Sequence, residues 1–91
     1  MSARREVRVI NKLGLHARPA AHFVKQVRTF RSDIWLVTAE GRYPASSLIE
    51  VLRANLECGA TATVEAHGVD AEEAVERLQK LVGELHKFDE S

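Results

Sequence analysis

One short segment carries residue types that can do chemistry at the start of a helix. His16 stands directly before a predicted helix, and Arg18 and Pro19 fall in its first turn. Unpaired backbone N–H groups and the positive end of the helix dipole attract anions to such a place. A neutral imidazole is a nucleophile near pH 7, and a guanidinium binds phosphate oxygens. The segment could therefore accept and hold a phosphoryl group on a ring nitrogen of His16.

A purely structural interpretation competes with this one. His16 could be an exposed N-cap residue, and Arg18 a solvated cation of the first turn. However, His is not a preferred N-cap type, and a cation is electrostatically unfavourable at a helix N-terminus. Two locally poor choices so close together favour a functional site. The local chemistry by itself leaves both interpretations open.

The spacing of apolar residues predicts the elements that position this segment. Period-two alternation predicts strands, as where Val7 and Val9 share one face, and helical spacing predicts helices. Pro19 is tolerated only in a first turn, so its helix must begin near residue 17. Asp70 and Glu73 have the spacing of a capping box before the last helix. Strands are expected at residues 6–10, 34–38, 42–45 and 60–67, and helices at 17–28, 48–52 and 71–85.

The element order β-α-β-β-α-β-α predicts the fold class. Elements of this number form an α+β sandwich, in which helices pack on one face of a single sheet. Trp35 and Val37 would then point to solvent from the other face, opposite Ile34 and Leu36. Because the chain has only 91 residues and no linker or repeat, residues 1–91 are expected to form one domain.

Composition and charge exclude several classes of protein. The chain has 13 basic and 13 acidic residues, which excludes a nucleic-acid binder held by phosphate neutralisation. No apolar run is long enough to insert in a membrane, and no signal peptide is recognisable, so a cytoplasmic location is expected. Cys58 is the single cysteine, so no disulfide forms within the chain. Without histidine pairs at metal-ligand spacing or a glycine-rich phosphate loop, we expect no metal and no cofactor.

Residues 14–21, Gly-Leu-His-Ala-Arg-Pro-Ala-Ala, resemble the active-site segment of a known family. This is HPr, the histidine-containing phosphocarrier family of the phosphoenolpyruvate-dependent sugar phosphotransferase system. The resemblance extends over about residues 6–85, and includes the element order, the distance from His16 to Ser47 and the Gly59 entry to the last strand. It implies an open-faced sandwich, with three helices on one face of a four-stranded antiparallel sheet.

The resemblance also implies a function. His16 would be phosphorylated on Nδ1 by phospho-enzyme I, with phosphoenolpyruvate as the original donor. IIA domains of sugar permeases, or regulatory equivalents, would accept the phosphoryl group for sugar uptake and phosphorylation. Arg18 would stabilise the phosphoryl group. The chain would act as a carrier in a relay and not as an enzyme.

Ser47 matches a second position of the family. In some bacteria the HPr kinase/phosphorylase phosphorylates a serine at this place, at the start of the short second helix. Ser46 precedes it here, where family members commonly carry lysine, and Glu50 follows inside the helix. The competing interpretation of Ser47 is a plain N-cap.

The second helix also carries a candidate docking surface. Leu48, Ile49 and Leu52 cannot all face the core from a two-turn helix. The resemblance implies that one or two of them form an apolar patch near His16, where enzyme I and IIA domains bind. Core packing is the competing interpretation of Leu52.

Two other functions stay open. A regulatory HPr-like protein, or one of the nitrogen branch, would act through phosphorylation-dependent docking to regulators. A generic small α+β binding domain would carry His16 by chance, which the complete octapeptide disfavours. A monomer is the simplest expectation for oligomeric state. The sequence does not identify the sugars or the IIA partners.

Overall fold

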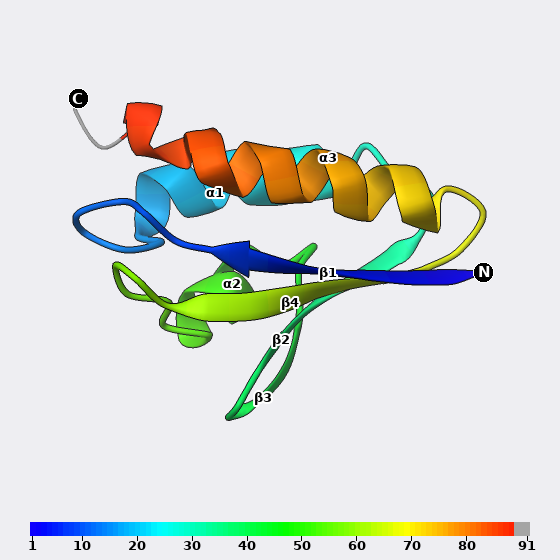
Figure 1. The fold of residues 1–91 in the computed structure, drawn as a ribbon, viewed down its shortest axis with the longest axis horizontal. Coiled ribbons are helices and arrows are strands. Elements are labelled where there is room, and N and C mark those ends of the chain that lie inside the picture. The colour runs from blue at the N-terminus through cyan, green and yellow to red at the C-terminus, as the bar shows by residue number, and fades with distance from the viewer. Residues whose placement is uncertain (89–91) are drawn as a thin grey trace.

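The computed structural model describes residues 1–88, and these form one sheet with a layer of helices (Figure 1). The element order is the predicted one, with a 3-10 turn, η1, added after the last helix. The last three residues of the expected domain lie outside the described residues. The strands are β1 (Ser2–Arg8), β2 (Asp33–Thr38), β3 (Gly41–Pro44) and β4 (Thr61–His67), and the helices are α1 (Ala17–Val27), α2 (Leu48–Arg53), α3 (Ala71–Glu84) and η1 (Leu85–Phe88).

The sheet has the strand order β1-β4-β2-β3, and every neighbouring pair is antiparallel. The central strands β4 and β2 pair Val64 with Leu36, and β4 pairs Ala62 with Val7 of β1. In Figure 1, α1 and α3 lie side by side over one face of this sheet. The predicted open-faced α+β sandwich is therefore confirmed. No helix in the described part of the chain is long and apolar enough to cross a membrane.

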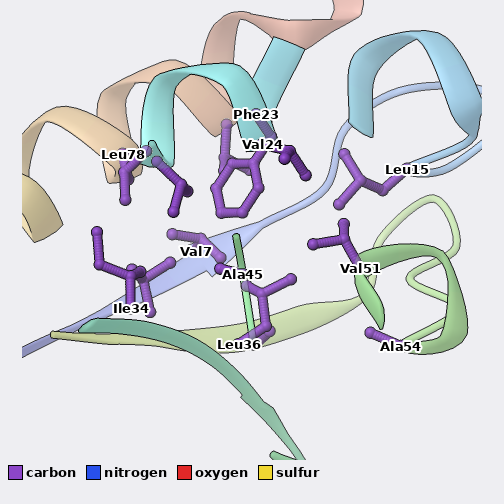
Figure 2. Close-up of a cluster of buried hydrophobic side chains, with 14 of the residues drawn as sticks. Val7, Leu15, Phe23, Val24, Ile34, Leu36, Ala45, Val51, Ala54 and Leu78 are labelled. Carbon is purple, nitrogen blue, oxygen red and sulfur yellow. The ribbon is translucent and has the colours of Figure 1, made fainter. Parts of the chain in front are cut away.

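The core lies between the sheet and the helices, and it fixes α1 above the strands (Figure 2). Val7, Leu36 and Val64 point toward the helices and are at most 4% exposed. Phe23 from α1 and Leu78 from α3 are fully buried against them. Burial of each large side chain contributes about 1.5–3 kcal/mol to the free energy of unfolding. These contacts hold α1 against the sheet, so its N-terminus has a defined position.

The first strand differs from the prediction. It begins at Ser2 and ends at Arg8, because its first half pairs with the far end of β4, where Arg4 lies opposite Glu65. The charged residues of this stretch mask its strand character in the sequence. Val9 lies beyond the strand but is 1% exposed, and its N–H donates to the Ala60 carbonyl.

The predicted capping box at Asp70 is wrong. Asp70 does occupy the N-cap of α3, but its side chain makes no capping hydrogen bond. Its carboxylate instead accepts hydrogen bonds from the Arg31 N–H (2.8 Å), the Ser32 N–H (2.9 Å) and the Ser32 hydroxyl (2.6 Å). The turn between α1 and β2 lies close by in space, and its donors compete with the helix for the carboxylate. Asp70 thus ties two distant segments together.

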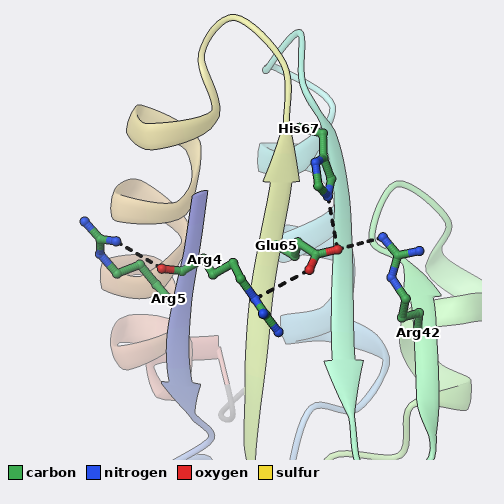
Figure 3. Close-up of polar contacts among 5 residues, drawn as sticks. All are labelled: Arg4, Arg5, Arg42, Glu65 and His67. Atoms are coloured by element: carbon green, nitrogen blue, oxygen red, sulfur yellow. Dashed lines mark hydrogen bonds and ion pairs between the residues drawn. The ribbon is translucent and has the colours of Figure 1, made fainter. Parts of the chain in front are cut away.

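The open face of the sheet is covered by a charged network (Figure 3). Glu65 accepts a hydrogen bond from Arg42 at 2.6 Å, lies 3.1 Å from His67 Nε2 and pairs with Arg4 at 3.5 Å. The hydrogen bonds from His67 and Arg42 hold the pKa of Glu65 below its ordinary value. The Arg42 guanidinium also lies 4.3 Å above the ring of Trp35. The outward-facing aromatic residue is therefore only partly exposed.

Candidate functional site

His16 lies at the N-cap of α1 but does not cap the helix with its side chain. Its backbone is extended, with φ −83° and ψ −172°, and its carbonyl accepts the first helical hydrogen bond from the Ala20 N–H (2.9 Å). The imidazole makes no capping hydrogen bond. The side chain is therefore placed at the helix start without the usual N-cap role.

The two ring nitrogens of His16 differ in their surroundings. The Nε2 atom is buried, whereas the residue as a whole keeps part of its exposure. Nε2 is therefore the ring nitrogen that a reactant from solvent would reach less readily.

The loop before His16 is held against the chain that follows α2. Gly14 has φ +72°, in the left-handed region that favours glycine. A Cβ at this position would lie only 2.6 Å from the Leu56 carbonyl oxygen and 2.9 Å from Glu57 Cα. The N–H of Leu15 donates to the same Leu56 carbonyl at 2.7 Å. These contacts fix the path of the backbone that leads to His16. The sequence alone did not predict this role of Gly14, and its only signal was a glycine between a strand and a helix start.

The first turn of α1 gives the site a positive character. It contains no acidic residue, so nothing there offsets the helix dipole. Pro19 is buried, whereas Arg18 is exposed. Arg18 lines a surface hollow of about 250 Å³ together with Ala21, His22 and Lys25. An anion brought to His16 would thus meet backbone N–H groups and a guanidinium on the same turn.

Ser47 begins α2 and caps it. Its hydroxyl oxygen accepts a hydrogen bond from the Glu50 N–H at 3.3 Å, and the residue is partly buried. Arg28, at the end of α1, donates from Nε to the Ser46 carbonyl at 2.9 Å. The capping role therefore exists in this structure, and a modification of the hydroxyl would compete with that bond.

The three predicted docking residues differ in exposure. Ile49 is 70% exposed and Leu52 is 38% exposed, so core packing of Leu52 is wrong. Leu48 is partly buried against the core. It also lines a hollow of about 260 Å³ between α1 and α2, together with Ala21 and Lys25. The exposed side of α2 thus continues onto the helix that begins at His16.

Within residues 1–88 no cluster of three or more potential metal ligands is found.

The fold and the site together define a class: a small open-faced sandwich that presents a histidine at an anion-attracting helix start. Comparison with known proteins gives the family. A family model described as "PTS HPr component phosphorylation site" matches residues 3–84.

Relatives and solved structures agree with that match. Phosphocarrier protein HPr of Vibrio cholerae is 41% identical over 83 residues, which cover 90% of this chain and 96% of the relative. Phosphocarrier protein NPr of Proteus mirabilis is 38% identical over 82 residues, which cover 89% and 91%. The crystal structure of HPr-C-His from Thermoanaerobacter tengcongensis superposes with a TM-score of 0.87 at 32% identity, covering 93% of this chain and 96% of that one. The chain belongs to the HPr family of phosphocarrier proteins of the phosphotransferase system.

Proposed function

We propose that this chain accepts a phosphoryl group from phospho-enzyme I on His16 Nδ1 and passes it to a IIA domain. The observation that carries the proposal is the placement of His16 at the start of α1, with its Nε2 atom buried. Burial of Nε2 favours Nδ1 as the nitrogen that carries the phosphoryl group. The chain acts as a carrier that is loaded and unloaded in turn, and not as a catalyst with a substrate of its own.

The geometry of the helix start supports a direct transfer step. The Nδ1 lone pair attacks phosphorus, and the bond from phosphorus to enzyme I breaks as the new N–P bond forms. The phosphoryl oxygens gain stabilisation from the N–H groups of the first turn and from the Arg18 guanidinium. In the second step a nucleophile of the IIA domain attacks the same phosphorus, and His16 leaves with its lone pair restored.

The proposal is tested by incubation with phosphoenolpyruvate and enzyme I, followed by intact mass measurement before and after acid treatment. We expect one added phosphoryl group that acid removes and that His16→Ala abolishes. His67→Ala is the matched control, because His67 lies on the open face of the sheet. No addition to the wild-type chain, with an enzyme I proven active on another carrier, contradicts the proposal.

A regulatory role at Ser47 is a second candidate. Its support is the position of the hydroxyl at the start of α2, where the helix dipole favours a phosphate. Incubation with an HPr kinase/phosphorylase and ATP should then add an acid-stable phosphate that Ser47→Ala abolishes and Ser46→Ala does not. If no acid-stable phosphate forms, Ser47 is an N-cap only.

The partners divide the sugar branch from the nitrogen or regulatory branch. Relatives named HPr and NPr are both similar to this chain, so similarity does not choose between the branches. Sugar uptake through IIA domains of permeases is our first choice. A pull-down with the phosphorylated chain should recover these domains, and recovery of regulators alone would favour the second branch.

We also propose that the carrier works in the cytoplasm as a monomer, without nucleic acid, membrane insertion or cofactor. A balanced count of 13 basic and 13 acidic residues supports the absence of a nucleic-acid partner. Size-exclusion chromatography with light scattering should give a mass near 10.2 kDa. Twice that mass contradicts the monomer.

A further inference from the structure

The C-terminal turn η1 is a part of this chain that the family match leaves unexplained. The match ends at residue 84, and η1 spans Leu85–Phe88. Leu85 is fully buried in the core, and Phe88 packs partly buried against it. Two apolar residues, three positions apart, thus anchor the turn to the molecule.

The Phe88 ring stacks on the ring of His22 in α1. The two ring centroids are 3.6 Å apart and the ring planes meet at 18°. His22 follows Arg18 by four residues, so both side chains lie on the same face of the helix. They line the same surface hollow with Ala21 and Lys25. The aromatic pair therefore adjoins the residue that would contact the phosphoryl group.

This face of the molecule carries two cations from α1. The helix α1 contains no acidic residue in its sequence, and it contributes Arg18 and Lys25. The turn η1 also carries Lys87, which is exposed. On the other flank of α1, Leu48 lines the neighbouring hollow and leads to the exposed side of α2. A continuous surface thus runs from α2 over α1 to η1, and acidic side chains of a partner would complement it.

We propose that the stacked pair His22 and Phe88 extends the docking surface and selects the phosphoryl-donor protein, through an acidic donor surface that seats against it. This inference rests on the proposed function. Aromatic anchors with few rotatable bonds contribute strongly to protein interfaces, and the stack holds both rings in place before binding. His22 and Phe88 act on recognition of the donor, since their stack lies beside the hollow that Arg18 lines.

The test is the rate of phosphoryl transfer from phospho-enzyme I at increasing concentrations of carrier. Loss of the stack in Phe88→Ala should raise KM about 3- to 10-fold and leave kcat unchanged. His22→Ala should have a similar effect, and the double variant should lose little more, because both substitutions remove one contact. Phe88→Tyr keeps an aromatic ring for the stack, so its KM should stay at the wild-type value.

Two further variants keep the result interpretable. Phe88→Leu retains apolar packing against the core but loses the stacked ring, so its KM should rise even if Phe88→Ala does not fold. Phe30→Leu is the matched control, because Phe30 is another partly buried phenylalanine that packs against the core, in the turn that follows α1. Its KM should stay at the wild-type value.

The outcomes separate this inference from the proposed function. If the wild-type chain is phosphorylated but Phe88→Leu leaves KM unchanged or lowers it, the docking role of the stack is overturned and the carrier function stands. A wild-type chain that active enzyme I does not phosphorylate overturns the carrier function itself.

Discussion

The candidate site combines residues with proposed chemical roles and residues that hold the chain in place. His16 and Arg18 share one helix turn, but they are presented differently: His16 is partly buried and Arg18 is exposed. Gly14 lacks a side chain, and its backbone lies so close to the Leu56 carbonyl that a Cβ would not fit. At this scale the proposed chemistry depends on a side chain at His16 and on the absence of a side chain at Gly14.

Replacing Arg18 should slow phosphoryl transfer without unfolding the chain. A charge-assisted hydrogen bond to the phosphoryl oxygens contributes about 1.5–3 kcal/mol, so Arg18→Ala should lower the transfer rate about 10- to 100-fold. Thermal unfolding should be nearly unchanged because Arg18 is exposed. Lys80→Ala, which removes an exposed cation of α3, serves as the control. Equal rates in the two variants would contradict the role of Arg18.

Replacing Gly14 should affect both stability and transfer. Gly14→Ala combines a positive φ with a contact of 2.6 Å to a backbone oxygen. We expect a loss of about 1–3 kcal/mol in the free energy of unfolding, measured by urea denaturation. The transfer rate should also fall, because the displaced loop carries His16. Gly83→Ala is the control, since a Cβ there meets nothing within 4 Å. Equal stability of the two variants would show that the close approach at Gly14 relaxes freely.

Elements build the site by bringing their ends and exposed sides together. The start of α1 supplies the histidine, and the loop after α2 supports the chain that leads to it. The exposed side of α2 lies on one flank of α1, and η1 lies on the other. Neither flank is adjacent to His16 in the sequence. A partner that reaches the imidazole would then contact α1 together with the exposed side of α2 and, by our further inference, η1.

The apolar patch on α2 predicts a docking defect. Ile49→Asp places a charge where a partner would bury an apolar side chain, so KM for phospho-enzyme I should rise about tenfold. The fold should persist, because Ile49 is 70% exposed. Val69→Asp is the matched control, since Val69 is 72% exposed and lies in the turn before α3. An equal KM in both variants would falsify the docking role of Ile49.

The whole molecule separates its charges although they balance in number. The helix α1 carries Arg18 and Lys25 and η1 carries Lys87, whereas the first turn of α3 carries Glu72 and Glu73. The open face of the sheet has its own network around Glu65, away from the helices. The hydrogen bonds of the Asp70 carboxylate join segments that are nearly 40 positions apart in the sequence. We therefore expect stability to depend on pH through contacts outside the candidate site.

Acid should weaken the fold in part through Asp70. The hydrogen bond from the Ser32 hydroxyl, followed by that from the Arg31 N–H, lowers the pKa of Asp70 below its ordinary value. A lowered pKa in the folded state stabilises the fold above the unfolded pKa, and this contribution is lost as the pH falls through the folded pKa.

Asp70→Asn should therefore lower Tm at neutral pH and reduce the fall of Tm between about pH 5 and pH 2. The measurement is thermal unfolding by circular dichroism across this range. Asp33→Asn is the control, because Asp33 is an exposed carboxylate at the start of β2. Parallel acid profiles for wild type and Asp70→Asn would exclude the linkage.

The sequence by itself determined the element types, the fold class and the position of the histidine. The period-two and helical spacings agree with the structure because one face of each element must be buried. The pattern of apolar residues therefore predicts which side chains lie in the core. Pro19 fixed the start of α1 for a similar reason, since a proline is accommodated only where its missing N–H costs nothing. These are local constraints, and local constraints can be read from neighbouring residues.

The tertiary structure decided what depends on residues distant in sequence. The extension of β1 to Ser2 required its pairing with β4, and the carboxylate of Asp70 turned from its own helix to the donors near Ser32. The exposure of Leu52, the close approach at Gly14 and the stack of Phe88 on His22 likewise arise from how elements pack. No spacing along the chain encodes these contacts, because each is a competition among partners that only folding brings within reach.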